Sequence, residues 1–284
     1  MLIKEASIKW NISERRIRKL IELGRIKGTK LGNVWTLPDD VSKPMDLRYK
    51  KDFIFKYDID ENEIRDINNK LNMIYKSRYI DRQQMALLKQ KLDLENVYFT
   101  NRFYGNRLTL NEVRIVLEGI TIPGRSIEEH LEIINYNKAL KYIEVNPNID
   151  IDKIKDIHRI LMNGLDMDNN LFRNEYINEQ LELVLDNYFK LKEYQPFLAS
   201  IYIHGEILKI KPYNEYNGKI AKLILNNSLI NNGISPISVP REDKIIYLNA
   251  VENVIKNNNY TDLINYLISK ENEILNKYLK IIKL

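Results

Sequence analysis

The segment Lys211–Lys222, KPYNEYNGKIAK, is a run of turn-forming and polar residues that leads into an amphipathic helix expected over Ile220–Ile230. Free backbone N–H groups at a helix start and the helix dipole both attract anions, so a polar loop in this place can bind phosphate. Asn217 and Gly218 begin the helix, and Glu215 beside them offers a hard oxygen ligand for Mg²⁺. For a lone N-G-K sequence, a loop that only caps a helix is the commoner meaning. The segment therefore predicts a helix-loop-helix whose loop is a candidate phosphate site.

The same twelve residues resemble the active-site signature of the Fic domain family, H-P-F-x-[D/E]-G-N-G-R-x-x-R, aligned without gaps. Four of them carry the family residue: Pro212, Glu215, Asn217 and Gly218. Lys211 stands where the family has its catalytic histidine. The resemblance implies binding of ATP phosphates and Mg²⁺ by Glu215, Asn217, Gly218, Lys219 and Lys222. It also implies AMP transfer from ATP to a protein hydroxyl.

The resemblance extends over roughly residues 95–284. Pro196–Lys211 is similar to the helix before the family motif, and Arg107–Leu140 and Ile151–Leu165 are similar to earlier family helices. Phe172–Ile177 resembles the flap, a short β-hairpin that aligns the target segment over the loop. It supplies the candidate flap residues Phe172, Arg173 and Tyr176. The implied fold is all-helical apart from that flap.

A second motif, TNRFYGN at Thr100–Asn106, is similar to the family's inhibitory-helix sequence [S/T]-x-x-x-E-[G/N]. Thr100 and Gly105 match it, and Tyr104 replaces the glutamate. In the family that glutamate pairs with the last arginine of the loop, which here is Lys222. Both partners of the inhibitory ion pair have therefore changed.

The departures from the signature bear on chemistry. A lysine at the Lys211 position could take a proton from a hydroxyl only if its pKa fell by several units from an ordinary value of about 10.4. Tyr216 replaces a glycine and would crowd the phosphate site or change its backbone. Lys219 and Lys222 are cationic but lack the two-pronged fork of arginine. We expect inefficient AMP transfer and no required cofactor, with weak binding of ATP and Mg²⁺ left open.

The basic charge of the chain is confined to its beginning. Residues 1–36 contain nine Lys or Arg and three Glu, a net charge of +6, whereas the other 248 residues carry 35 basic and 36 acidic side chains. Met1–Pro38 resembles the small winged helix-turn-helix modules of excisionase and MerR-like regulators. The pattern predicts a helix with Ile3, Ala6, Ile8 and Trp10 on its apolar face, a second helix over Glu14–Leu23 ended by Gly24, and a β-hairpin wing.

The second helix of this module is the candidate recognition helix. Its cations point away from Ile17, Leu20 and Ile21, and a basic helix of this kind fits the DNA major groove. The alternative is a solvated basic helix with no target. The residues expected to bind DNA are Arg15, Arg16, Arg18 and Lys19 on the helix and Lys27 and Lys30 in the wing.

The remaining chain offers no other chemical motif. It has no cysteine, which excludes a disulfide framework and a thiolate zinc site, and no apolar stretch long enough to span a bilayer, so we expect a cytoplasmic protein. Apolar residues recur at helical spacing from Asp60 to Leu94, which predicts two bridging helices. His130, His158 and His204 lack acidic neighbours at ligand spacing and are interpreted as structural residues.

Taken together, the sequence predicts a mainly α protein. A winged helix-turn-helix at 1–45 is joined by a helical linker at 46–95 to a Fic-like domain at 96–284. The preferred function is a DNA-binding transcriptional regulator that binds double-stranded DNA as a homodimer, whose catalytically degenerate Fic-like domain serves dimerisation or ligand sensing. The first alternative is a protein AMPylase with an altered site. The second is a scaffold that binds a protein partner in the flap groove.

Overall fold

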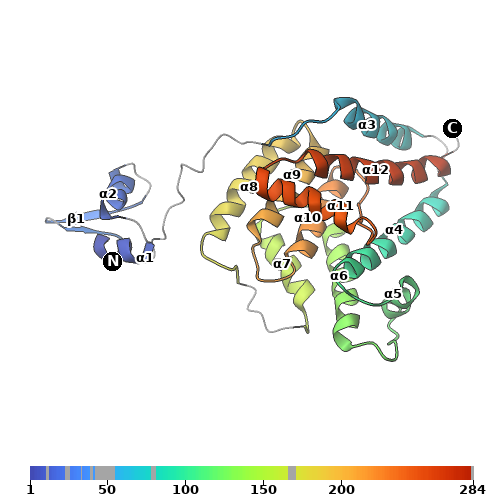
Figure 1. Cartoon of the computed structure of the whole chain (residues 1–284), viewed down its shortest axis with the longest axis horizontal. Helices are drawn as coiled ribbons and strands as arrows, with labels where there is room; N and C mark the ends of the chain where they lie inside the picture. The colour runs from blue at the N-terminus through green and yellow to red at the C-terminus, as the bar shows by residue number, and fades with distance from the viewer. Residues whose placement is uncertain are drawn as a thin grey trace. The chain divides into compact units, whose positions relative to one another are not determined.

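The computed structural model describes residues 1–10, 13–22, 26–32, 34–38, 41, 55–77, 81–165 and 171–282. The chain divides into two compact units, Met1–Phe53 and Ile54–Leu284 (Figure 1). The mainly helical class expected from the sequence is confirmed, and the only sheet in the described residues is a two-stranded antiparallel hairpin. Within the same residues, none of the helices combines the length and the apolar character that crossing a membrane requires.

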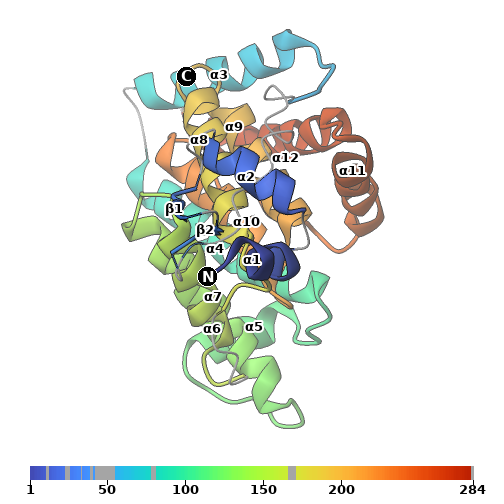
Figure 2. The same cartoon turned by 90° about the vertical axis from the view of Figure 1, so that its left-hand side faces the viewer.

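The first unit contains two helices followed by the hairpin (Figure 2). Its elements are α1 (Ile3–Trp10), α2 (Glu14–Glu22), β1 (Thr29–Leu31) and β2 (Val34–Thr36), and Lys30 pairs with Trp35 across the hairpin. The core consists of Ile3, Ala6, Trp10, Ile17, Leu20, Ile26 and Leu37. Ile8, expected in this core, is 76% exposed, because it falls on the opposite face of α1 from Ala6 and Trp10. The expected helix end at Gly24 lies outside the described residues.

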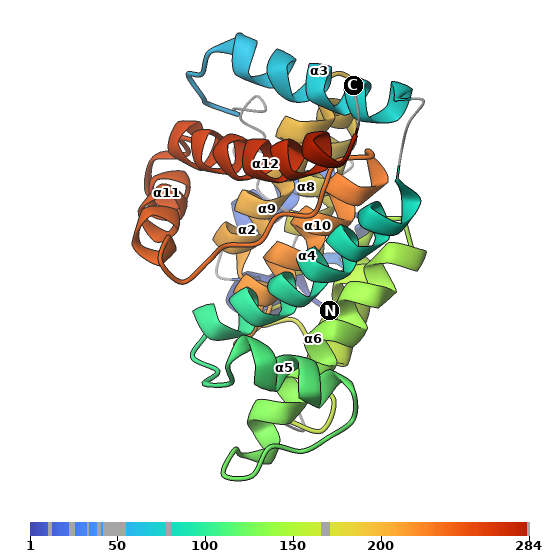
Figure 3. The same ribbon diagram turned by 90° about the vertical axis from the view of Figure 1, so that its right-hand side faces the viewer.

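The second unit is built around two consecutive helices, α9 and α10, which pack on each other along their length. Of the 15 residues in each, 10 in α9 and 11 in α10 are buried. α8 packs on α9, α6 packs on α10 and α7, and α12 packs on α3 and α11 (Figure 3). The helices of this unit are α3 (Glu61–Lys76), α4 (Arg82–Phe103), α5 (Leu110–Leu117), α6 (Ile127–Val145), α7 (Ile151–Met162), α8 (Ile177–Lys192), α9 (Pro196–Ile210), α10 (Asn217–Asn231), α11 (Lys244–Asn257) and α12 (Thr261–Ile281).

Local sequence explains where several of these helices begin. Asp60, Asp81 and Asp150 accept hydrogen bonds from first-turn amides of α3, α4 and α7. Capping boxes start α5 and α6, formed by Thr109 with Glu112 and by Ser126 with Glu129. These two boxes lie beside the segment that follows α4, and they help to position the candidate site.

Two expectations need adjustment. The helices expected to bridge the two domains, α3 and the first half of α4, belong to the second unit, where α12 contacts both of them. The expected β-hairpin flap is not formed by the described residues of that region, since Leu171–Tyr176 adopts bends and turns and hydrogen-bonds to the loop after α9 instead of to a second strand. Residues 166–170, which precede it, lie outside the described residues.

The small core of the first unit should lose stability when one of its buried side chains is shortened. Ile17 is fully buried in it, so Ile17→Ala should lower the free energy of unfolding of this unit by about 3 kcal/mol. Both tryptophans of the chain, Trp10 and Trp35, lie in the first unit, so their fluorescence reports its unfolding while far-UV circular dichroism reports mainly the helical second unit. We expect an earlier fluorescence transition and an unchanged circular-dichroism transition in urea.

The exposed Ile8 supplies the matched control, because Ile8→Ala removes the same atoms from a solvated position and should shift neither transition. A loss of stability in Ile8→Ala as large as that in Ile17→Ala would contradict the assignment of this core.

Candidate functional site

The loop between α9 and α10 is a tight turn held in an unusual backbone conformation. Lys211, which ends α9, has φ of 50°, and Tyr216, which precedes α10, has φ of 60°. Both values lie in the left-handed region that non-glycine residues seldom adopt. Tyr216 therefore adopts the left-handed backbone conformation that glycine favours. Compared with the glycine of the family signature, only the side chain at this position differs.

The start of α10 presents backbone donors. The first backbone hydrogen bond of the helix runs from the Ile220 amide to the Tyr216 carbonyl, and no side chain caps this helix. The amides of Asn217, Gly218 and Lys219 come before that bond, as the free donors of a helix start do. The Asn217 side chain is engaged elsewhere. Its Oδ1 accepts from the Tyr213 amide at 2.9 Å and its Nδ2 donates to the Tyr213 carbonyl at 2.7 Å, which closes the loop.

The other side of the loop rests on α7 and on the predicted flap residues. The buried ring of Tyr213 stacks on His158 with centroids 3.6 Å apart, and Phe172 packs against the same ring. The Arg173 amide donates to the Pro212 carbonyl at 2.9 Å, and its guanidinium donates to the Ile210 carbonyl at 3.1 Å. Two of the three flap residues therefore contact the loop region, whereas Tyr176 precedes the first turn of α8.

Lys219, predicted to bind phosphate, is buried and already paired. Its ammonium lies 3.2 Å from Oε1 of Glu132 on α6 and 4.9 Å from the centre of the Tyr216 ring. Burial lowers the pKa of Lys219, while the carboxylate of Glu132 opposes that shift. Oε2 of Glu132 also accepts from the Asn106 side chain at 2.9 Å. The charge of Lys219 is thus used to join α10 to α6 and to the segment after α4.

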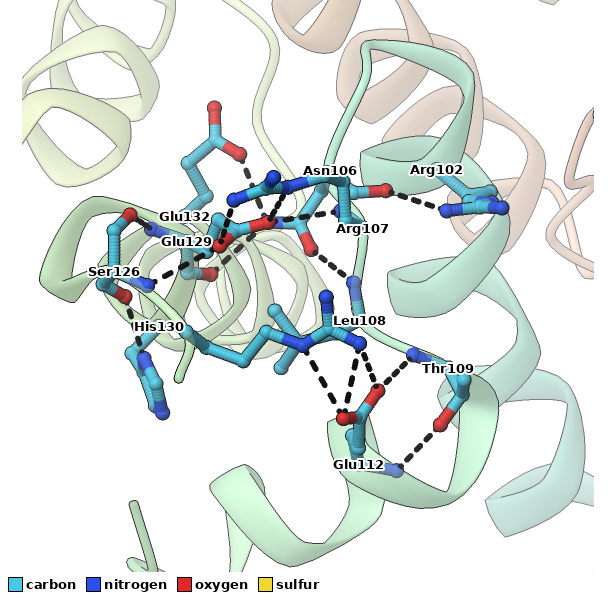
Figure 4. A network of polar contacts seen from close by, with 11 residues as sticks. Arg102, Asn106, Arg107, Leu108, Thr109, Glu112, Ser126, Glu129, His130 and Glu132 are labelled. Atoms are coloured by element: carbon cyan, nitrogen blue, oxygen red, sulfur yellow. Dashed lines mark hydrogen bonds and ion pairs between the residues drawn. The ribbon is translucent and has the colours of Figure 1, made fainter. Parts of the chain in front are cut away.

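A polar network fixes residues 106–109, in the segment between α4 and α5 (Figure 4). The Asn106 side chain also donates to the Glu129 carbonyl, and Arg107 forms an ion pair with the Glu129 carboxylate at 2.9 Å. The hydrogen bonds from Arg107 lower the pKa of Glu129 to about 2. The guanidinium of Arg125 donates two hydrogen bonds to Oε1 of Glu112. Because these contacts pin residues 106–109 to the first turns of α5 and α6, they also fix the end of α4, where Tyr104 lies.

Tyr104 ends α4 and covers Gly218. A Cβ atom at position 218 would overlap the Tyr104 hydroxyl, so the ring lies directly against the first turn of α10. The neighbouring motif residues Thr100 and Gly105 do not reach the loop: Thr100 is buried within α4, and Gly105, with φ of 102°, turns the chain away from it. In this arrangement the tyrosine ring occupies the space directly over the Gly218 backbone.

Lys222 is buried among aromatic rings. Its ammonium lies 3.7 Å from the centre of the Phe103 ring, 5.1 Å from Tyr104 and 5.3 Å from Tyr247, and it has no hydrogen-bond partner in the described part of the chain. Burial, together with the nearby charges of Lys244 and Lys219, lowers the pKa of Lys222 to about 7. The amine of Lys222 is therefore only partly protonated near neutral pH, whereas the sequence led us to expect a full positive charge, because desolvation favours the neutral form.

His204 does not replace the missing histidine of the loop. It is fully buried in α9, with Nδ1 at 2.8 Å from the Ala221 carbonyl and Nε2 at 2.7 Å from the Tyr247 hydroxyl. The Ala221 carbonyl can only accept, so Nδ1 donates to it, and in the neutral ring Nε2 then accepts from the Tyr247 hydroxyl. Burial lowers the pKa of His204 to about 4. The structural role expected for this histidine is consistent with these contacts.

Lys211 and Glu215 are the two predicted site residues that face solvent. Both are exposed, and neither side chain forms a hydrogen bond or ion pair with another described residue. Glu215 belongs to no cluster of three or more acidic or histidine side chains in the described ranges. The loop therefore offers one carboxylate and one amine above a helix start that Tyr104 covers.

In the first unit, the side chains of Arg15 and Arg18 on α2 and of Lys27 and Lys30 near the hairpin are exposed. Ile17 and Leu20 face the core instead, as the sequence predicts. Arg18 forms an ion pair with Glu14 at 3.0 Å on the helix surface. The side chains of Arg16 and Lys19 lie outside the described residues.

Glu132 and Asn106 were not predicted as site residues from the sequence, and His158 was interpreted there only as a structural residue. Glu132 and His158 lie on helices that the resemblance includes, and Asn106 ends the inhibitory-motif segment. A buried Lys219 requires a carboxylate partner, which is a signal that some acidic residue must approach it. Sequence spacing gives no way to choose Glu132, 87 positions away, among the acidic residues of the chain.

No protein-family model matches this chain. Among curated relatives, the protein adenylyltransferase fic-1 of Caenorhabditis elegans is 29% identical over 174 residues, covering 53% of this chain and 34% of the relative. The protein adenylyltransferase Fic of Drosophila persimilis is 24% identical over 213 residues, covering 66% of this chain and 41% of the relative. The matched region thus spans between a third and a half of each of these relatives.

Solved structures show the same fold at low sequence identity. Residues 134–508 of Fic-1 from C. elegans superpose with a TM-score of 0.71 at 23% identity, covering 78% of this chain and 71% of that one. A Fic domain containing signaling protein from Bacteroides thetaiotaomicron superposes with a TM-score of 0.69 at 20% identity, covering 78% of this chain and 97% of that one. These superpositions establish the fold of the helical body.

Burial of Lys222 should make the stability of the protein depend on pH. A lysine whose pKa falls from 10.5 to about 7 on folding binds fewer protons in the folded than in the unfolded state between those values, so the free energy of unfolding rises with pH across that range. Replacing Lys222 by methionine should therefore stabilise the protein by a few kcal/mol near pH 6 and by much less near pH 10. Urea unfolding at both pH values measures this difference.

Lys211→Met is the matched control, because it removes the same charge from an exposed position. It should change the unfolding free energy little at either pH. Equal gains for Lys222→Met at the two pH values would show that burial of its charge does not limit stability.

Proposed function

Because the chain belongs to the Fic domain family, we propose that it is a nucleotide-dependent adenylyltransferase of low activity, which transfers AMP from ATP to a hydroxyl of a protein. The proposal is supported by the helix start at Asn217–Lys219, which presents three amide donors beside Glu215, and by the names of the curated relatives. ATP supplies the AMP group, and the target hydroxyl oxygen attacks the α-phosphorus as pyrophosphate leaves. The residues of this chain have to bind the phosphates and take up the proton of the hydroxyl.

The observation that carries this proposal is the uncapped start of α10, whose first amides lie beside Glu215 as a phosphate site requires. The position of Tyr104 over Gly218 is the reason for proposing that the activity is low. The ring is held by an edge contact with Phe103 and by Lys222. Such contacts are worth about 1–2 kcal/mol together, so moving the ring would reduce ATP affinity roughly tenfold. Binding of ATP and Mg²⁺ is accordingly proposed to be weak.

Lys211 is the candidate proton acceptor, because it is exposed at the edge of the loop and occupies the position of the family histidine. An amine accepts a proton only when it is neutral, so transfer through Lys211 is expected to be slow. Neither cation of α10 offers an arginine-like fork, since Lys219 is bound to Glu132 and Lys222 is enclosed by rings.

The first test measures ATP binding and AMP transfer on the full chain with ATP labelled at the α-phosphate. Tyr104→Ala should bind ATP about tenfold more tightly than the natural chain and incorporate more label into itself or into added lysate proteins. Lys211→Ala should lose transfer while keeping ATP affinity. Tyr194→Ala, which truncates a tyrosine that is 82% exposed, is the control and should change neither quantity.

Two results would reject the proposal. Label incorporation that is undetectable in both the natural chain and Tyr104→Ala, from pH 7 to pH 9.5, would show that the fold carries no transferase activity. Unchanged ATP affinity in Tyr104→Ala would show that this ring does not obstruct the phosphate site.

A second candidate function is sequence-selective DNA binding by the first unit, through α2. It is supported by the exposed Arg15 and Arg18 opposite a buried face, and by a net charge of +6 over residues 1–36. With this function we propose a regulatory role and a homodimer that places two such helices on two half-sites. A protein partner in the flap groove is a separate proposal.

The DNA proposal predicts that Arg15→Ala with Arg18→Ala weakens binding to duplexes selected from a random-sequence library by tenfold or more, and removes their advantage over unselected DNA. Lys4→Ala with Lys9→Ala removes two exposed charges from α1 and is the matched control. It should lower affinity equally for selected and unselected duplexes and leave the selectivity intact. Equal selectivity loss in both variants would reject α2 as the recognition helix.

A further inference from the structure

A cavity lies at the opposite end of α10 from the loop. It has a volume of about 440 Å³, which is within the usual size of a small-molecule site. Its walls are mainly apolar and include Leu71 of α3, Leu92 of α4, Ile234 after α10 and Leu275 of α12. Figure 3 faces this side of the body, where α3, α12 and the beginning of α4 come together.

The cavity is separate from the phosphate loop. Ile230 and Gly233 line it at the end of α10, whereas the loop precedes Asn217 at the other end. Since an α-helix rises about 1.5 Å per residue, the 15 residues of α10 place the two roughly 20 Å apart. A ligand in this cavity would therefore not contact Tyr104 or Lys211.

A fully buried carboxyl group stands beside the cavity without a cation. Glu271 lies on α12, one helical turn before Leu275, and its Oε1 accepts from the amide of Ser235, a lining residue, at 3.4 Å. Its Oε2 has no hydrogen-bond partner in the part of the chain that the structure describes. Burial raises the pKa of Glu271 to about 8. Buried carboxyl groups are normally bonded at both oxygens, so this one has an unused acceptor next to an empty apolar space.

The tyrosines of the cavity wall are close enough to this carboxyl to sense its charge. Burial and then the charge of Glu271 raise the pKa of Tyr75, and burial, with smaller contributions that include Glu271, raises the pKa of Tyr278. The Tyr75 hydroxyl donates to the Gly233 carbonyl. Two tyrosine rings thus line the cavity, and a buried carboxyl group lies directly behind its lining residue Ser235. Aromatic rings together with a carboxylate are a combination that recognises organic cations.

The other charged groups of the cavity add to its negative character. Lys89 pairs with Asp93 at 2.7 Å and with Glu144 at 2.6 Å, so one lysine faces two carboxylates. The group carries an excess negative charge even before Glu271 ionises. A positively charged ligand is favoured by this field, and a carboxylate ligand is disfavoured.

We propose that this cavity binds an amphipathic organic amine, with its apolar part between α3, α4 and α12 and its ammonium group paired with Glu271 beside the Tyr75 and Tyr278 rings. The apolar walls supply most of the affinity, and the unused acceptor of Glu271 selects the charged head group. Binding of the ammonium requires an ionised Glu271. It should therefore release a proton below about pH 8 and become tighter as the pH rises from 6 to 8.5.

The test uses three probes that share one apolar chain: octylamine, 1-octanol and octanoate. Isothermal titration calorimetry of the full chain at about pH 8 should show octylamine binding at least tenfold more tightly than 1-octanol, and octanoate binding least. In two buffers of different ionisation enthalpy at about pH 7, the heats should report proton release on octylamine binding. 1-Octanol should give equal heats in both buffers, because it displaces no proton.

Two variants locate the effect. Glu271→Gln keeps the shape of the side chain and should weaken octylamine at least tenfold, abolish its proton release and leave 1-octanol unchanged. Leu71→Trp fills the cavity from a half-buried position and should prevent binding of both, and thermal melts establish that each variant is folded. Equal binding of the three probes, or unchanged octylamine affinity in Glu271→Gln, would overturn the proposal.

Discussion

The burial of two consecutive helices on nearly all sides is the constraint on which this structure depends. α9 and α10 place most of their residues in the core, so every other helix of the body packs around them or around their neighbours. A connection between two buried antiparallel helices has to emerge at one end of the core. The polar loop at 211–216 is that connection, and its place at the surface follows from the apolar sequences on both sides of it.

The same burial changes what the charged residues of α10 do. Lys219 and Lys222 lie in the first two turns of a helix that is enclosed by α6, α9 and the end of α4, so water cannot solvate them. Glu132 neutralises one, and the rings of Phe103 and Tyr104 surround the other. A desolvated cation needs a partner of this kind, or else it loses its proton. The lysines therefore contribute to the packing of the site as much as to its charge.

The loop keeps its shape while its reactive groups differ from the family signature. Asn217 closes the turn, Tyr213 is stacked on His158, and Arg173 holds two loop carbonyls. None of these contacts depends on the residues at 211, 216, 219 or 222. This separation explains how the loop keeps its backbone conformation while the side chains at these four positions differ from the family signature.

Sequence alone determined the helical class, the two helices joined by a loop around residue 211, the residues that form this loop, and the basic first unit. These features could be predicted because periodicity, capping residues and motif spacing are local properties. The sequence also predicted that Ile8 is buried, whereas the structure exposes it. It predicted a full positive charge on Lys222, whose pKa is lowered by burial. Tertiary structure decided the pairing of Lys219 with Glu132, the cover of Tyr104 over Gly218, and the unpaired carboxyl of Glu271 beside a cavity. Each of these joins residues far apart in the chain, and the desolvation that sets their charge exists only once the helices have packed.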